Sequence, residues 1–514
     1  MEIASAPVQI DNLRKWWISI TLFLGTLSVG LSVTAVNVAI PTIMSSFGTS
    51  LNRIQWVLTG FMITRTVLIP SVGWLGDRIG DRNVFILGTS LFTAGSLLCS
   101  ISWDTESLIL FRIVQGLGAG PLLGVSMAIM FDAFPRHERG LAMGLFMTGW
   151  SLGPFLGPLL GGYLAEHVHW RAIFYINLPT GVLSIFAGYF ILPRTTSSAA
   201  AAPLDGFGLL TLTGASTTLL LALSMGQEEG WASDFIISLF TASAILFVCF
   251  VAVELRSKHP FVEVGYFRDL NFSLANILIF FRVFGFRGAN FLVSLFLQRA
   301  LNYTPTQAGI FLLPGALITG LWSPVAGTLT DRLGPRVPIV GGFVILVFAI
   351  YGLSTLTLWS TAALIFFFMC VKSVGQASLN APLNTVALAA LPEGRARMGS
   401  GMIGMTRGLG EAFSIGVVSF LLERFAYFNL YSIPELQGAL FTAIQRIDAL
   451  SEIRNLLVHA GQFGGALQTR ADSLLAHALI SQALTQAYQD LFLLIALLHV
   501  GLIVIALFLR TKRA

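Results

Sequence analysis

One acidic side chain, Glu411, is predicted to lie deep inside a membrane. It stands near the middle of an apolar run over about residues 399–423, whereas Asp132 and Asp490 lie close to the ends of theirs. An ionisable group at such depth is costly and marks a functional site. Burial favours the protonated form of a carboxylate and nearby cations favour the charged form, so Glu411 is a candidate proton site. An ion pair with Arg407, one helical turn earlier, is the alternative.

Six cations fall inside the predicted spans around this single deep acid: Arg65, Arg112, Arg282, Arg287, Lys372 and Arg407. A cavity with such an excess of positive charge favours anionic, amphipathic substrates such as weak lipophilic acids, and it disfavours lipophilic cations. The alternative is that some of these side chains reach an interface or bind lipid phosphate. Phe284, close to Arg282, is a candidate for an apolar part of the same pocket.

The composition is that of a multi-pass membrane protein. Of 514 residues, 55% are hydrophobic and 11% are charged, whereas soluble domains carry about 25% charged residues. The formal net charge of +5 gives no support to nucleic-acid binding in such a chain. The cysteines lie far apart, without metal-ligand or disulfide spacing. The spans contain no nucleophile–base pair and no phosphate-binding GxxxxGK[ST] loop, so we expect neither an enzyme, a metal site nor a cofactor, and a proton gradient as the energy source.

Apolar runs of membrane-spanning length predict an all-α integral membrane protein with about fourteen helices. The runs lie near residues 16–44, 54–76, 83–102, 106–131, 139–165, 171–193, 206–226, 233–254, 270–298, 307–329, 337–357, 361–390, 399–423 and 488–510. The short loops on one side hold only Arg53, Arg171 and Arg299, and most other loop cations lie on the side of the N-terminus. Because loop cations accumulate in the cytoplasm, both termini are expected there.

An internal repeat divides the chain into two related halves. Gly73 begins GWLGDRIGDR and Gly327 begins GTLTDRLGPR, each directly after an apolar run. Residues 1–193 and 270–514 are therefore expected to supply six helices each, and residues 194–269 a linker and two inserted helices. Such repeats are typical of transporters with a site between the halves. The amphipathic segment 425–489 is predicted to form a helical extramembrane cap on the outer side.

The two repeated loops have the composition of a conformational switch. An aspartate and arginines flank glycines, so Asp77 can cap a neighbouring helix end or pair with an arginine of the other half. Contacts of this kind are made in one transporter state and broken in another. The alternative is a static turn that only anchors the topology. The gating candidates are Gly73, Asp77, Arg78, Arg82, Asp331, Arg332 and Arg336.

A run of small residues, GWSLGPFLGPLLGG at 149–162, places a glycine on one helix face at every turn. Such a stripe predicts close packing against a partner helix. Pro154 and Pro158 remove backbone donors from the same helix, so we expect it to bend. We expect this glycine seam to lie at the interface with the second half.

These motifs, in this order, resemble the major facilitator superfamily and, within it, the fourteen-helix drug:proton antiporters of the EmrB/QacA type. The loop at Gly73–Arg82 is similar to the family's loop motif, and FRIVQGLGAG, with Arg112, to its fourth-helix motif. The resemblance covers nearly the whole chain. It identifies the seam as the family's antiporter motif, carried by Gly153, Pro154, Gly157, Pro158, Gly161 and Gly162.

The resemblance also assigns roles to single residues. Arg112 and Arg407 fall on family motif positions, where the former assists proton transfer by tuning a nearby carboxylate. The family has an acid in helix 1 where this chain has Ser32, which leaves Glu411 as the proton-site candidate. Asn37, on the same motif, is a polar candidate for the substrate pocket. The family more often has uncharged residues at Arg65, Arg282 and Arg287.

The sequence thus predicts a proton-coupled secondary exporter of amphipathic organic compounds that works by alternating access. A facilitator or importer of the same fold, or a ligand sensor that does not transport, is the alternative. The resemblance implies the inner membrane of a bacterium as the location. The expected partners are a small-molecule substrate, membrane lipids and a periplasmic adaptor protein that docks on the cap.

Overall fold

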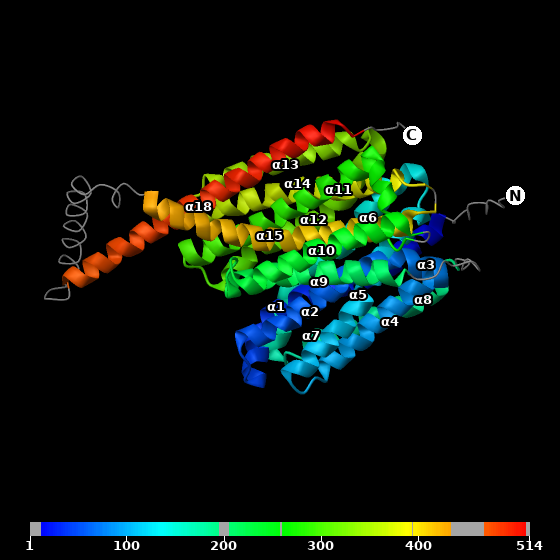
Figure 1. The fold of residues 1–514 in the computed structure, drawn as a ribbon, viewed down its shortest axis with the longest axis horizontal. Helices are drawn as coiled ribbons and strands as arrows, with labels where there is room; N and C mark the ends of the chain where they lie inside the picture. The colour runs from blue at the N-terminus through cyan, green and yellow to red at the C-terminus, as the bar shows by residue number, and fades with distance from the viewer. Residues whose placement is uncertain (1–11, 195–204, 258–259, 393, 433–466, 510–514) are drawn as a thin grey trace.

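The protein is a bundle of long helices (Figure 1). The computed structural model describes residues 12–194, 205–257, 260–392, 394–432 and 467–509, and these residues form no β-strand. Thirteen segments in this part of the chain are long and apolar enough to cross a membrane. A further helix, α6 (Arg139–His167), has 29 residues and packs against α1 and α12. The predicted all-α membrane fold with about fourteen long helices is confirmed.

The first six spans are built from α1 to α8. Their bounds are α1 Asn12–Phe47, α2 Leu51–Leu68, the 3-10 turn η1 Ile69–Ser71, α3 Val72–Ile79, α4 Asp81–Ser100, α5 Thr105–Ala133, η2 Arg136–Glu138, α6 Arg139–His167, α7 Ala172–Tyr175 and α8 Asn177–Ile191. The inserted pair is α9 Gly206–Glu229 and α10 Asp234–Arg256, followed by η3 Val264–Arg268. The last six spans are α11 Leu270–Leu295 with the π-turn η4 Phe296–Ala300, α12 Pro305–Leu333, α13 Arg336–Ser354, α14 Ala362–Ala389, α15 Ala396–Ser432 and α18 Leu467–Leu507.

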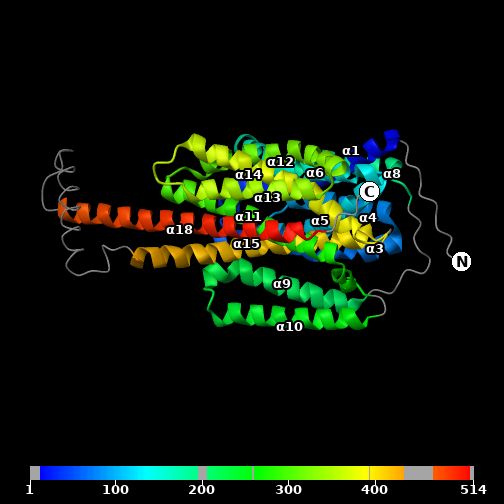
Figure 2. The same cartoon turned by 90° about the horizontal axis from the view of Figure 1, so that it is seen from above.

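One predicted helix is interrupted at a proline, and the helices α15 and α18 extend far beyond the predicted spans. The run at 54–76 breaks into α2, η1 and α3 at Pro70, which has no N–H to donate. Helices α15 and α18 have 37 and 41 residues, which corresponds to about 55 and 62 Å of helix. Since a bilayer core is about 30 Å thick, both extend beyond it (Figures 1 and 2). Part of the predicted cap is therefore continuous with these spans, and its residues 433–466 lie outside the described residues.

Local sequence signals set the ends of several helices. Gly80 and Gly334 end α3 and α12 with φ of 82° and 79°, a conformation that favours glycine. They occupy matching positions in the two repeated loops. Helix α5 begins at Asp104, which accepts a hydrogen bond from the Ser107 N–H at 2.8 Å. The Ser107 side chain and N–H lower the pKa of the Asp104 carboxyl by hydrogen bonding to it.

The two halves meet at the end of the bundle where α1 begins and α18 ends, called here the terminal end (Figure 1). There, Gly140 and Gly144 of α6 lie so close to the α12 backbone that an added Cβ would overlap it. One turn further along α6, Thr148 Oγ1 donates to the Gly320 carbonyl of α12 at 2.8 Å. Toward the opposite end, the first half has an apolar cluster of its own around Ile43 and Trp170. The described contacts therefore close the terminal end.

Candidate substrate and proton site

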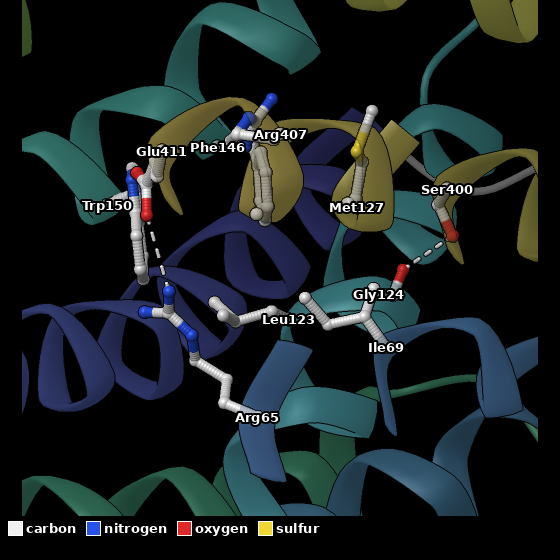
Figure 3. A pocket seen from close by; sticks show the side chains of 12 residues that line it. Arg65, Ile69, Leu123, Gly124, Met127, Phe146, Trp150, Ser400, Arg407 and Glu411 are labelled. Atoms are coloured by element: carbon white, nitrogen blue, oxygen red, sulfur yellow. Dashed lines mark hydrogen bonds and ion pairs between the residues drawn. The ribbon is translucent and has the colours of Figure 1, made fainter. Parts of the chain in front are cut away.

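A small cavity lies between the halves where α2, α5, α6 and α15 converge (Figure 3). Its volume is about 40 Å³, enough for a few water molecules and far below the roughly 300 Å³ that a drug-sized ligand needs. Both charged and apolar side chains line it. The lining residues are Arg65, Ile69, Leu123, Gly124, Met127, Phe146, Trp150, Ser400, Gly404, Arg407, Gly408 and Glu411.

Glu411 of α15 is held by arginines from both halves. Its Oε1 accepts from Arg287 Nη2 of α11 at 2.7 Å, and its Oε2 accepts from Arg65 Nη2 of α2 at 3.4 Å. The Glu411 side chain is 12% exposed and that of Arg65 is 6% exposed. Arg407 instead donates to Asn384 Oδ1 at 3.2 Å. The ion pairs of Glu411 in the structure thus join different helices, and the one with Arg65 ties the first half to the second.

Four arginines surround this one carboxylate, and we call Arg65, Arg282, Arg287 and Arg407 the arginine cluster. All four are close enough to interact electrostatically with Glu411. The Nε atoms of Arg65, Arg282 and Arg407 are buried without a hydrogen-bond partner. A buried cation without a compensating acceptor is costly. The cluster therefore offers donors to an anion that Glu411 alone does not satisfy.

Trp150 of α6 forms the aromatic wall beside these charges. The guanidinium of Arg65 lies 5.3 Å from the Trp150 ring centroid, a cation–π distance. Sequence reasoning did not single out this residue. Its place in the glycine seam, directly after Gly149, is a signal that could have found it.

Arg112 lies in a separate polar network within the first half. It is 1% exposed, and its Nη1 donates to Ser32 Oγ at 2.9 Å and to Gln115 Oε1 at 2.6 Å. Its Nε donates to the Val57 carbonyl at 3.1 Å. Among the described residues, no carboxylate forms an ion pair with it. Ser32, which replaces the helix-1 acid of the family pattern, is therefore a direct neighbour of Arg112.

Five of the six predicted pocket residues do not line this cavity. Arg282 and Arg287 belong to the arginine cluster, and the other three lie elsewhere. Lys372 of α14 is fully buried, donates from Nζ to Asn290 Oδ1 and lies 4.9 Å from the Phe286 ring centroid. Asn37 is exposed on α1. Phe284 is partly buried on α11.

Sequence reasoning also missed His499, a fully buried residue of α18. Its Nδ1 lies 2.7 Å from the Ile495 carbonyl, and its Nε2 has no hydrogen-bond partner. Gly285 of α11 leaves room for the ring. A lone histidine inside the apolar run LHVGL was the available signal.

At the terminal end, three aspartates make contacts between the halves. Arg397 of α15 pairs with Asp77 at 2.6 Å and with Asp81 at 2.7 Å. In the second repeat, Asp331 accepts from the backbone N–H groups of Gly140 and Leu141 at 2.7 and 2.8 Å. It thereby caps the positive N-terminal end of α6. Asp77 and Asp331, which match in the repeated loops, thus use the two kinds of contact that the loop composition suggests.

The other gating candidates surround these contacts. Arg82 donates to the Tyr189 carbonyl, and Arg78 lies 5.3 Å from the Trp74 ring centroid. Gly73 packs on Met398, and Arg332 and Arg336 are exposed. Arg397 was missed as a gating residue, although its place at the predicted start of a helix of the second half, on the side of the repeated loops, could have indicated it.

The glycines of the seam in α6 face α1 of the same half, so their predicted place at the interface with the second half is wrong. The helix itself does lie at that interface, where Leu152 of the same run contacts Gly320 of α12. Gly153, Gly157 and Gly161 lie against Gly30, Thr34 and Ala35. The contact with α12 uses Gly140, Gly144 and Thr148. Successive residues of a helix are turned by about 100°, so this second row forms a different stripe on the same helix. Pro158 continues the helix, and the Pro154 side chain lies outside the described ones.

The comparisons with known proteins agree with this fold. The Major Facilitator Superfamily model matches residues 22–415. The chain belongs to the major facilitator superfamily. It is 28% identical to the Multidrug export protein EmrB of Haemophilus influenzae over 96% of this chain and 95% of that protein.

Two further proteins are similar to this chain. The Fatty acid resistance protein FarB of Neisseria gonorrhoeae is 30% identical over 79% of this chain and 81% of that protein. The crystal structure of the human organic anion transporter MFSD10 superposes with a TM-score of 0.59 over 94% of this chain and 99% of that one. Because the latter is 16% identical, it supports the fold alone. The resemblance inferred from the motifs is confirmed, and the chain is a multi-pass membrane protein with relatives in bacteria.

Proposed function

We propose that this protein exports amphipathic organic compounds across the bacterial inner membrane by alternating access. The observation that carries the proposal is the carboxylate of Glu411, shared between arginines of opposite halves beside a cavity with an apolar wall. The closed terminal end and the names of the exporters EmrB and FarB support it. The cavity is too small for an organic substrate in this conformation, so it has to widen as the halves move.

Glu411 is the proton-binding group in this proposal. Protonation removes its charge and weakens both ion pairs, the one to Arg65 in the first half and the one to Arg287 in the second. A proton would therefore loosen a tie between the halves at the depth of the cavity. Protonation of Glu411 would thereby couple a proton gradient to the movement of the two halves, and no cofactor is required.

The substrates we propose carry a carboxylate or another acidic group. Arg65 and Arg407 line the cavity, and each has a buried Nε donor without a partner. An acid head group would bind these guanidinium groups while Glu411 keeps its own partners. The apolar wall of Met127, Phe146 and Trp150 would hold the body of the molecule. The name of FarB, a fatty acid resistance protein, is consistent with this class.

The electrostatics fix the sign of the coupling within one state. Neutralising Glu411 makes the cluster more positive, so it strengthens the binding of an anion and weakens that of a cation. The proton and the anion thus favour each other's binding in one state. Exchange of an anion for a proton therefore requires that the protein cannot change state with both bound, so that each crosses in a separate half of the cycle. An inside-negative potential of 100 mV adds about 2.3 kcal/mol per exported negative charge.

Transport into proteoliposomes with an imposed pH gradient tests the proposal. The matched probes are 4-phenylbutanoate and 4-phenylbutylamine, which differ in the charge of the head group. The wild type should move the acid against its gradient and the amine poorly, and Glu411→Gln should lose the dependence on the pH gradient. Transport of the amine alone, or unchanged coupling in Glu411→Gln, would contradict it. Equilibration without any gradient dependence would indicate a facilitator.

Two finer expectations stay predictions. The cytoplasmic position of both termini follows from the loop cations alone. Docking of a periplasmic adaptor protein was predicted on residues 425–489, of which 433–466 lie outside the described residues.

A further inference from the structure

The inserted helices α9 and α10 cover one side of the bundle (Figure 2), and α9 contacts both α2 and α15. Their contact with the bundle is an apolar cluster beside the ion pairs of Glu411. Met62 and Ile63 precede Arg65 on α2 by two or three residues, and Ala412 follows Glu411 on α15. The side chains of this cluster, called here the hairpin seam, are Met62, Ile63, Leu219, Leu220, Leu223, Trp231, Phe240, Ala412 and Phe413.

The hairpin is attached unequally to the two halves. Toward α15, Gln227 Nε2 donates to Glu423 Oε1 at 2.9 Å, and the ring centroids of Trp231 and Phe420 lie 5.8 Å apart. Gly416 of α15 fits so closely that an added Cβ would lie 2.9 Å from Leu223. Toward α2, within the described residues, no hydrogen bond or ion pair joins α9 to that helix. Because apolar contacts are not directional, they can slide or part at lower cost than these fitted ones.

In the described part of the chain, no hydrogen bond or ion pair joins the outer helix of the pair to the first half. Helix α10 packs on α9, where Ser243 Oγ donates to the Ala215 carbonyl at 2.9 Å. Its other face is exposed, with Val248 at 67% and Ile245 at 58%. Exposed apolar side chains at this level of a membrane protein meet lipid. The seam therefore lies between the bilayer and the arginine cluster.

We propose that the α9–α10 hairpin moves with the second half and that the α2–α9 contact is the lipid-side entrance of the site. This inference rests on the proposed alternating access. When the halves move, α9 stays on α15 and parts from Met62 and Ile63. An amphiphile with an acidic head group, dissolved in the bilayer, then slides its head group to Arg65 while its apolar body remains in the seam.

Two cysteine pairs test which contact has to open. After replacement of Cys99, Cys249 and Cys370 by serine, Ile63→Cys is combined with Leu219→Cys across the entrance. The matched control combines Gln227→Cys with Glu423→Cys across the contact that should stay closed. Both pairs are joined by the same short bifunctional thiosulfonate, and transport of dodecanoate into proteoliposomes is measured before linking, after linking and after reduction.

The linked α2–α9 pair should lose at least nine-tenths of its transport and regain it on reduction, whereas the linked α9–α15 pair should keep at least half. The inference would be overturned if linking abolished transport in the α9–α15 pair alone, in both pairs or in neither pair. The unlinked pairs separate the two proposals, because absence of transport in them and in the wild type would refute the proposed function instead.

A labelling experiment tests the contact with lipid directly. Leu219→Cys should react several-fold faster with pyrenylmaleimide dissolved in the bilayer while dodecanoate is being transported than at rest. Val248→Cys, on the exposed face of α10, should react at one rate in both conditions. An unchanged rate at Leu219→Cys would overturn the entrance.

Discussion

At the scale of single residues, the decisive feature is the imbalance of charge around Glu411. Four guanidinium groups and one carboxylate share a site at the junction of the halves. An ion pair buried in low dielectric is worth little unless the remaining donors are satisfied. Three of the arginine Nε atoms are not. In the proposed function, the acidic group of the substrate supplies the acceptor that these donors lack.

The neighbourhood of Arg112 offers a second position at which a proton-binding carboxylate can be introduced. Its Nη1 donates to Ser32 Oγ at 2.9 Å, so a carboxylate at position 32 would be within reach of the guanidinium. We expect Ser32→Asp to restore pH-gradient dependence to a Glu411→Gln protein in proteoliposomes, because it supplies a second buried titratable group. The isosteric control Ser32→Asn, which cannot titrate, should restore nothing. Equal behaviour of the two double variants would contradict this expectation.

The sequence was enough to find the charged residues of the site and not enough to pair them. Depth in an apolar run singled out Glu411, and the count of buried cations singled out its neighbours. Spacing along one helix suggested Arg407 as the partner, yet the partners come from α2 and α11, which are far away in the chain. Helix-to-helix contacts of this kind are not encoded in local periodicity, and the same limit hid Trp150.

At the scale of elements, α6 shows how one helix serves two interfaces. Its glycine seam packs on α1 within the first half, and its second stripe packs on α12 of the other half. The spacing of glycines predicted a close contact correctly but not the partner, because both stripes contain small residues. The span count and the repeated loops were predicted more fully, since hydrophobic length and repetition depend on the chain alone.

The seam makes a prediction about stability. A Cβ at Gly153 would overlap the backbone of Gly30, which has no flexible side chain to move aside. Gly153→Ala should therefore destabilise the protein by about 1–3 kcal/mol. At Gly162 the nearest atom is Val38 Cγ1 at 3.6 Å, an ordinary contact, so Gly162→Ala should change stability by less than about 0.5 kcal/mol. Thermal unfolding in detergent checks both, and similar losses in the two variants would refute the packing argument.

At the scale of the whole molecule, the contacts of Arg397 and Asp331 hold the halves together at the terminal end. Asp77, which pairs with Arg397, and Asp331 occupy matching positions in the two repeated loops, so both halves use the same loop to make the closure. The arrangement is that of a transporter closed at one end, and opening that end requires these contacts to break.

Removal of an ion pair at the terminal end should increase the fraction of molecules in which that end is open. The pair of Arg397 and Asp77 is partly exposed, with side-chain exposures of 22% and 49%, and such pairs contribute about 0.2–1 kcal/mol. Asp77→Asn should therefore raise the labelling rate of a cysteine at Ser400, on the cavity, by up to about fivefold from the terminal end. The control Arg53→Gln breaks an exposed pair with Glu106 within the first half and should leave the rate unchanged. A larger effect from Arg53→Gln would contradict the gate.

The most direct test of the account is the affinity for an organic anion in the purified protein, measured by equilibrium dialysis of 4-phenylbutanoate at pH 7. Glu411→Gln removes the negative charge from the cluster, so its dissociation constant should fall by about tenfold, which corresponds to about 1.4 kcal/mol. Arg65→Gln should raise it by a similar factor, and Arg53→Gln should leave it unchanged. Weaker binding of the anion by Glu411→Gln, with tighter binding by Arg65→Gln, would contradict the central claim that the arginine cluster is an anion site.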